Sequence, residues 1–159
     1  MLHSLIYFHV LIPNTKVLQM LWKQHWNLDK LHEVHKNTMQ EYIGIEFLEI
    51  GDDFLRARMP VDHRTLQPLG LLHGGASVTL AESLGSLASL MCVDMDKQVV
   101  VGLEINANHI KSSREGFVYG ITRHIHLGRS THVWEIKIYN EANQLTCISR
   151  ITNAILEKK

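Results

Sequence analysis

The sequence has little of several features that define large protein classes. Its 159 residues include two cysteines and three prolines, and aromatic residues make up only 7%. Cys92 and Cys147 are too few for a disulfide framework, and neither belongs to a C-x-x-C pair. No apolar run approaches the roughly 20 residues of a membrane helix. These absences favour a cytoplasmic protein with reduced thiols and no membrane partner.

An excess of charge of one sign is also missing. Lys and Arg number 16 and Asp and Glu number 16, so the formal net charge is zero. A nucleic-acid-binding domain usually carries a basic surface, so no nucleic-acid partner is expected. Hydrophobic residues make up 45%, which is enough to build a core in a chain of this length. We therefore expect one folded domain.

Residues 1–19 differ from the rest of the chain. The apolar run Leu5 to Ile12 has no basic residue before it and no small-residue cleavage site after it, unlike a signal peptide. A chain beginning at Met20 would lose only this segment. We predict that residues 1–19 are an N-terminal extension, upstream of the true start, and that residues 20–159 form the domain.

Hydrophobic periodicity predicts the secondary structure of that domain. A helix is expected over 28–39, capped by Asn27, followed by a hairpin of strands 43–47 and 55–59. A long helix over about 76–93 is apolar nearly all round, so it must be buried against a sheet. The chain closes with four predicted strands, at 98–110, 116–126, 131–140 and 144–156. This order predicts an α+β fold in which an antiparallel sheet embraces one long helix.

One predicted strand has a clear alternation of side chains. In the segment 98–110 we expect one face to carry Val99, Val101, Leu103 and Ile105. The opposite face should carry Glu104, Asn106 and Asn108. Such a strand would be apolar on one side and polar on the other.

The strongest chemical pattern lies where the long helix begins. His73, Gly74 and Gly75 precede it, and a helix N-terminus offers free N–H groups that glycine lets an oxygen approach. Such a site suits the oxyanion of acyl transfer. Two turns further on, Glu82 lies among small apolar residues as a candidate general base, with Ser86 one turn beyond. Spacing alone leaves open a plain helix entry and a solvent-facing Glu82.

Other titratable residues gave weaker patterns. The stretch His32, Glu33 and His35 lacks the H-E-x-x-H spacing, and His124 and His126 need further ligands to hold a metal. We expect no metal. Lys111, Arg114, Arg123 and Arg129 fall near strand ends and suit either ligand phosphates or ordinary surface charge.

Residues 59–87 (MPVDHRTLQPLGLLHGGASVTLAESLGSL), 100–110 (VVGLEINANHI) and 126–130 (HLGRS) closely resemble the hotdog-fold acyl-CoA thioesterases. The resemblance extends from residue 20 to residue 156. It implies a long central helix wrapped by a curved antiparallel sheet. It also implies a dimer that pairs into a homotetramer, with active sites between subunits and no cofactor apart from the coenzyme A of the substrate.

The resemblance also implies roles for individual residues. Glu82 resembles the catalytic carboxylate, Gly74 the oxyanion donor, His73 and Gln67 the groups around the thioester carbonyl, and Ser86 the residue that positions water. Coenzyme A contacts are implied for Gly102, His109, Ile110, Lys111, Ser112, His126, Leu127, Gly128, Arg129, Ser130 and Thr131. Lys111 stands where relatives often have Arg, and Leu69 where they often have Phe.

The substrate implied is an aromatic acyl-CoA thioester of the 1,4-dihydroxy-2-naphthoyl-CoA type, in menaquinone biosynthesis. Glu82 would act as general base or as nucleophile, which the sequence does not separate. A proofreading thioesterase for misacylated aryl carrier protein and a broad-range acyl-CoA thioesterase remain alternatives. A hotdog dehydratase would need a His–acid pair, which the sequence does not offer, and a non-catalytic acyl-CoA-binding module would not need Glu82.

Overall fold

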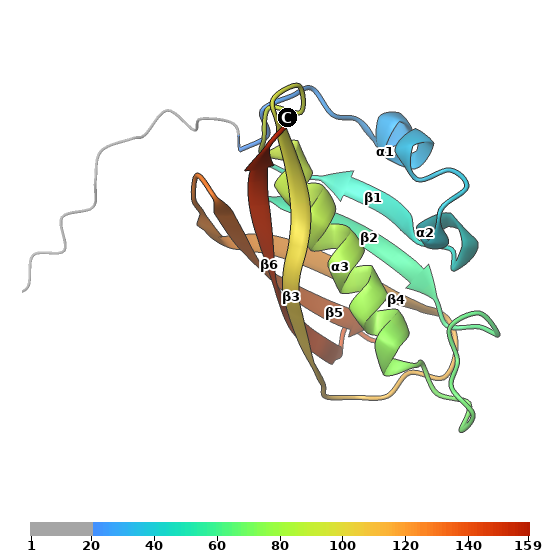
Figure 1. The fold of residues 1–159 in the computed structure, drawn as a ribbon. Coiled ribbons are helices and arrows are strands. Elements are labelled where there is room, and N and C mark those ends of the chain that lie inside the picture. The colour runs from blue at the N-terminus through green and yellow to red at the C-terminus, as the bar shows by residue number, and fades with distance from the viewer. Residues whose placement is uncertain (1–20) are drawn as a thin grey trace, which may run out of the picture.

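The computed structural model describes residues 21–159, in which six antiparallel strands curl around one long helix (Figure 1). The predicted extension, residues 1–19, lies outside this part. The helices are α1 (Leu28–Val34), α2 (Met39–Tyr42) and α3 (Gly74–Met91). The strands are β1 (Glu46–Ile50), β2 (Phe54–Pro60), β3 (Gln98–His109), β4 (Phe117–Leu127), β5 (Thr131–Asn140) and β6 (Leu145–Glu157). The expected α+β hotdog architecture is confirmed.

The small residues of α3 allow the sheet to wrap closely around it. Leu80, Ala81, Leu84 and Ala88 are 0% exposed, and they pack against the concave face of the sheet. A Cβ atom at Gly85 would lie 2.3 Å from Cγ2 of Ile151 on β6, so only glycine allows this approach. The predicted buried helix is therefore confirmed, and its composition follows from the closeness of its neighbours.

The strand order leaves β3 at an edge of the sheet. The order is β1-β2-β4-β5-β6-β3, and each neighbouring pair is antiparallel. Within residues 21–159, β3 therefore has a strand partner on one side only, although it is 12 residues long. A long unpaired edge is a template for pairing with another strand.

The first helix is shorter than predicted. Instead of continuing to residue 39, α1 ends at Val34, and the separate four-residue α2 follows. Asn37 has φ +58°, a left-handed conformation that terminates a helix. Gly44 has φ +77°, so β1 begins at Glu46 rather than at residue 43. Both differences come from backbone conformations that hydrophobic periodicity does not report.

The predicted alternation along β3 is wrong at its centre. The pairing with β6 shifts between Gly102 and Glu104, which makes Leu103 the extra residue of a β-bulge. Leu103 is 62% exposed, whereas Ile105 packs against the core. The bulge therefore places Leu103 and Ile105 on opposite faces, and Val101 before it is exposed together with Leu103.

Candidate active site

His73 stands at the entrance of α3 as its N-cap residue. Its Nδ1 accepts a hydrogen bond from the Gly75 N–H, at 2.8 Å. Because an accepting nitrogen does not carry the proton, a neutral His73 ring carries it on Nε2. A Cβ atom at Gly75 would lie 2.9 Å from the His73 Nδ1, so glycine allows the ring to fold back. His73 therefore presents an Nε2–H donor at the helix entrance.

The first turn of α3 leaves one backbone donor unused among residues 21–159. The N–H groups of Ala76 and Ser77 reach the His73 carbonyl, at 3.0 and 3.2 Å, and that of Gly75 reaches the His73 ring. The Gly74 N–H has no hydrogen-bond partner within this part of the chain. Since a helix N-terminus carries partial positive charge, this N–H has the geometry that an oxyanion donor needs.

A pocket of about 290 Å³, which we call the mouth pocket, opens beside Gly74. The predicted site residues that line it are Gln67, Gly74, His109, Ile110, Lys111 and Ser112. A Cβ atom at Gly74 would lie 2.7 Å from Nε2 of His109, so the imidazole lies directly over this glycine. The Gln67 Oε1 accepts from the Leu69 N–H, which leaves the Gln67 amide hydrogens for a ligand.

The loop that carries Gln67 is held by an ion pair and a turn. Arg64 Nη2 lies 2.6 Å from Asp62 Oδ2, and the hydrogen bond with Arg64 lowers the pKa of Asp62 to about 2. A bridge between Leu66 and Leu72 closes the loop. These contacts fix the position from which Gln67 reaches the mouth pocket.

Glu82 lies two turns into α3, in a second pocket of about 330 Å³ that we call the Glu82 pocket. Ser86 Oγ donates a hydrogen bond to Glu82 Oε1, at 2.8 Å. A Cβ atom at Gly102 would lie 3.0 Å from the same oxygen, so the absence of a side chain on β3 leaves room for the carboxylate. Apolar walls surround these polar groups, from Val34, Leu87, Leu90 and Val100.

The two pockets do not converge within one chain. Gly74 and Glu82 are eight residues apart on one helix, which is about 12 Å of helical rise. One carbonyl group cannot contact both. The predicted catalytic residues therefore fall into two groups, with Gln67, His73 and Gly74 at the mouth and Glu82 with Ser86 in the second pocket.

The remaining predicted coenzyme A contacts lie at the turn between β4 and β5. This turn carries His126, Leu127, Gly128, Arg129, Ser130 and Thr131, and the Gly128 N–H closes it by donating to the Thr131 carbonyl at 2.9 Å. On β6, Thr131 pairs with Ala154, whereas His109 pairs with Cys147. Seven residues of strand correspond to about 23 Å, so this turn is remote from the mouth pocket of the same chain.

The four basic residues do not form one cluster within the chain. Lys111 and Arg114 lie between β3 and β4, and Arg129 lies in the remote turn between β4 and β5. Arg123 forms an ion pair with Asp53 beside the start of β2. A phosphate-binding group made of all four side chains of one chain is therefore excluded.

Asn153 is a site-region residue that sequence reasoning missed. It is 0% exposed on β6, and its side chain reaches α3 through Gly85 and Ser89. A signal was present in the sequence, because Asn153 is a lone amide on the strand face that carries the apolar Ile151 and Ile155. A buried amide in that position needs hydrogen-bond partners, and the active-site helix supplies them.

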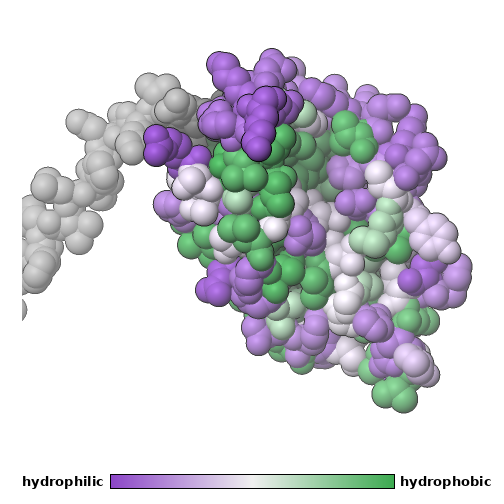
Figure 2. All heavy atoms as spheres, viewed as in Figure 1, coloured by the Kyte–Doolittle hydropathy of each residue, from purple (hydrophilic) through white to green (hydrophobic). Residues whose placement is uncertain are grey.

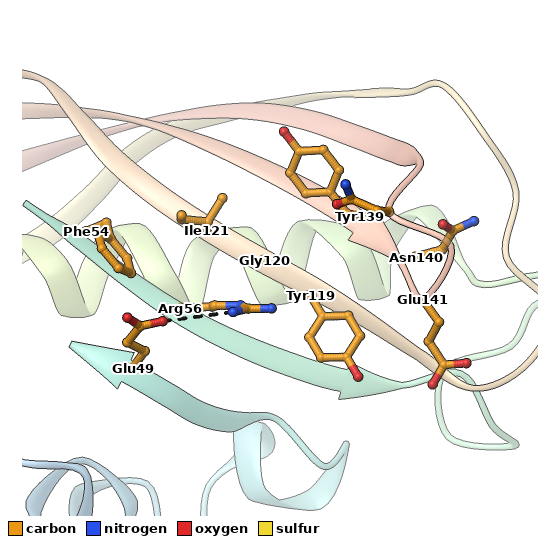
Figure 3. A pocket seen from close by; sticks show the side chains of 10 residues that line it. Glu49, Phe54, Arg56, Tyr119, Gly120, Ile121, Tyr139, Asn140 and Glu141 are labelled. Carbon is orange, nitrogen blue, oxygen red and sulfur yellow. Dashed lines mark ion pairs between the residues drawn. The ribbon is translucent and has the colours of Figure 1, made fainter. Parts of the chain in front are cut away.

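A larger hollow lies on the outer face of the sheet and contains none of the predicted site residues (Figure 3). Its volume is about 710 Å³. Arg56 lies over the Tyr119 ring and 3.9 Å from a Glu49 carboxylate oxygen. Charged and aromatic side chains thus occupy this face, on the side of the sheet away from α3.

Three histidines outside the mouth pocket contact the backbone or are buried. His32 Nε2 lies 3.1 Å from the Phe47 carbonyl oxygen, and His35 Nδ1 lies 2.6 Å from that of Leu31. Burial, and to a lesser extent the nearby His126, lower the pKa of His132 to about 4.

Residues 21–159 contain no group of three or more His, Cys, Asp or Glu side chains able to hold a metal ion. The same part contains no helix long and apolar enough to cross a membrane.

Comparison with known proteins gives consistent matches. The model of the family described as "Thioesterase superfamily" matches residues 69–147. The chain is 53% identical over 137 residues to 1,4-dihydroxy-2-naphthoyl-CoA hydrolase of Escherichia coli, covering 86% of this chain and 100% of that protein. It is 47% identical to the proofreading thioesterase EntH of Cronobacter turicensis, covering 86% and 99%. A mutant of the Pseudomonas aeruginosa thioesterase PA1618 superposes with a TM-score of 0.86 at 49% identity, covering 87% and 99%.

Proposed function

The chain belongs to the thioesterase superfamily, and on that premise we propose that it hydrolyses an aromatic acyl-CoA thioester of the 1,4-dihydroxy-2-naphthoyl-CoA type. The observation that carries this proposal is its likeness to the Escherichia coli hydrolase of that substrate over that enzyme's whole length. The apolar walls of the Glu82 pocket, with Gln40 and His35 beside them, suit a hydroxylated ring. With this substrate, the enzyme acts in menaquinone biosynthesis in the cytoplasm.

In the proposed mechanism, Glu82 activates the attack on the thioester carbonyl. As general base it takes a proton from water while the water oxygen bonds to the carbonyl carbon. As nucleophile it bonds to that carbon itself, and water later cleaves the resulting anhydride. In both routes the carbon–sulfur bond breaks, and the thiolate of coenzyme A leaves and takes up a proton.

The groups at the mouth pocket serve the carbonyl oxygen in this proposal. The Gly74 N–H and the positive end of α3 stabilise the negative charge that develops there, and the His73 Nε2–H is a second donor. The free amide hydrogens of Gln67 orient the carbonyl or the water. Lys111, His109 and the turn from His126 to Thr131 contact coenzyme A, which is part of the substrate, so we propose no separate cofactor.

We propose that a homodimer completes the site, and that two dimers form a tetramer. Figure 2 shows hydrophobic side chains gathered on the face that carries β3, where Val101 is 46% and Leu103 62% exposed. Antiparallel pairing of two β3 edges about a two-fold axis reverses one chain relative to the other. The mouth pocket of one chain then lies beside the Glu82 pocket of its partner. Light scattering of the wild type and of Leu103→Lys tests this, and a wild-type monomer would contradict it.

A second candidate is proofreading of misacylated aryl carrier protein, because EntH is similarly related. The two functions share the acyl chemistry and differ in the carrier of the thioester. Steady-state hydrolysis of one hydroxyaromatic acyl group on coenzyme A and on an aryl carrier protein separates them. We expect the higher kcat/KM with coenzyme A, and the reverse order would establish proofreading.

The direct test of the proposed function is Glu82→Gln. This change removes the base but keeps the shape and a hydrogen bond to Ser86, so kcat with a hydroxyaromatic acyl-CoA should fall about a thousandfold. The thermal unfolding midpoint should stay within about 3 °C of the wild type. Glu49→Gln, which changes an exposed carboxylate on β1 at the outer face of the sheet, is the matched control and should keep full activity. Turnover retained in Glu82→Gln would exclude the assigned role.

A further inference from the structure

Asn153 links Glu82 to the core through a chain of hydrogen bonds. Its Nδ2 donates to Ser89 Oγ at 2.8 Å and to the Gly85 carbonyl at 3.3 Å. Ser89 Oγ also accepts from the Trp134 Nε1–H, at 2.7 Å. Asn153, Ser89 and Trp134 are each 0% exposed, so water does not compete for these bonds.

This surrounding fixes which end of the Asn153 amide faces the active site. The Gly85 carbonyl can only accept, so the amide nitrogen must face it. The amide oxygen then faces Ser86, with Oδ1 3.4 Å from Ser86 Oγ. A flipped amide would set two acceptors against each other in a buried site. The orientation is thus set by the fold.

Ser86 has one hydroxyl proton and two acceptors in reach. Its Oγ lies 2.8 Å from Glu82 Oε1 and 3.4 Å from Asn153 Oδ1. When Glu82 is ionised, the proton points to the carboxylate, because a hydrogen bond to a charged acceptor is the stronger one. When Glu82 is protonated, its O–H can donate to Ser86 Oγ only if the Ser86 proton turns elsewhere. Asn153 Oδ1 is the group in position to accept it.

We propose that Asn153 is a positioning residue that keeps Ser86 bonded to Glu82 in both protonation states of the carboxyl group. This inference rests on the proposed role of Glu82. The proton that Glu82 takes from water stays on Glu82 and is then passed to the departing thiolate. The Ser86 proton only changes acceptor, from Glu82 to Asn153 and back, so no bond to hydrogen is broken at Ser86.

The titratable surroundings of Glu82 are few among the described residues. His35, which follows α1, shares its pocket, and the other lining residues from α2, α3 and β3 carry no charge. On β5, His132 pairs in register with Asn153, and burial lowers its pKa to about 4. Every variant below keeps both histidines, and the Glu82 carboxyl resonance described below reports Glu82 separately from them.

Two substitutions of Asn153 should move the pH dependence in opposite directions. Asn153→Leu removes the acceptor that serves protonated Glu82, so the acidic limb of the kcat/KM profile should move about half a unit lower and kcat should fall about tenfold. Asn153→Asp places a second carboxylate beside Ser86, so that limb should move about one unit higher. If Asn153 were only structural, its substitution would change stability, and the acidic limb of the kcat/KM profile would stay in place in both variants.

A titration without substrate makes the result independent of the proposed reaction. The ¹³C resonance of the Glu82 carboxyl carbon, assigned by its loss in Glu82→Gln, reports its protonation directly. The pH midpoint of this resonance should fall in Asn153→Leu and rise in Asn153→Asp, as the acidic limb of the kcat/KM profile does. If Asn153→Leu does not fold, Asn153→Val replaces it in this comparison.

Ser149→Ala is the matched control, because the buried Ser149 on the same strand also donates a hydrogen bond, to the Asn106 carbonyl at 2.6 Å. It should lose stability but keep the wild-type midpoint and kcat. Unchanged Glu82 midpoints in the Asn153 variants would overturn the inference. If the wild type cleaved no thioester, the proposed function would fail, and the resonance would still decide the role of Asn153.

Discussion

The mouth pocket and the Glu82 pocket belong to one helix but are built in opposite ways. At the mouth, the Gly74 N–H and the His73 Nε2–H point outward without a partner among residues 21–159. Around Glu82, the polar groups bond one another, from Ser86 through Asn153 to Ser89. The donors at the mouth are therefore free to bind a ligand, whereas the polar groups around Glu82 are already hydrogen-bonded within the chain.

This difference indicates which part of the site is formed before a substrate binds. The Glu82 pocket is preorganised by the core, so its geometry does not depend on the substrate. The mouth supplies donors whose partner must come from outside the chain. Because about 12 Å of helix separates the two regions, the proposed dimer would bring the mouth pocket of one chain against the Glu82 pocket of the other.

After the loss of the Glu82 carboxylate, the next largest effect is expected from crowding the mouth pocket. In Gly74→Ala the new Cβ would lie 2.7 Å from His109 Nε2, so the donor and the imidazole cannot both keep their places. We expect kcat/KM to fall about a hundredfold, which is typical for loss of an oxyanion contact. Steady-state kinetics and thermal melting measure this, with Thr79→Ala, five residues further along α3, as control. Equal losses in both variants would contradict a specific role for Gly74.

An intermediate effect is expected from crowding the Glu82 pocket. In Gly102→Ala the added Cβ would lie 3.0 Å from Glu82 Oε1, so the carboxylate must shift by a few tenths of an ångström. We expect kcat to fall about tenfold, because the carboxylate of Glu82 moves out of line with the reacting carbonyl. Wild-type kcat in this variant would show that the Glu82 position tolerates displacement.

The last prediction concerns stability rather than activity, in the surroundings of Asn153. His132 is 5% exposed beside Asn153, and its pKa is lowered to about 4. An unfolded chain binds this proton near pH 6.5, so stability should decrease by a few kcal/mol as the pH falls from about 6.5 to about 4, and not below. Urea unfolding across this range should give a flatter curve for His132→Gln. An identical slope in both proteins would contradict the assignment.

Much of this comparison could be predicted from the sequence, because long apolar patterns and glycines next to a helix report local constraints. The central helix, the four closing strands and the pairing of Glu82 with Ser86 follow from such patterns. The β-bulge at Leu103 does not, since one extra residue in a strand depends on pairing with β6.

The hydrophobic pattern does not predict the helix break near Asn37 either, because the break depends on one left-handed residue. Asn153 escaped for a related reason, as its partners Gly85 and Ser89 lie 68 and 64 residues away in sequence. Contacts at such separations are set by tertiary packing. Local periodicity therefore locates the helix that carries the site but not the strand residue that supports it.

The central claim is that one active site combines the mouth of one chain with Glu82 of another. Mixing Glu82→Gln with Gly74→Ala, after denaturation and refolding together, tests it most directly. Each variant alone should be nearly inactive, and random pairing should restore about a quarter of wild-type activity, because half of the dimers then hold one intact site. No recovery, in a mixture shown by mass to contain mixed dimers, would mean that both regions act within one chain.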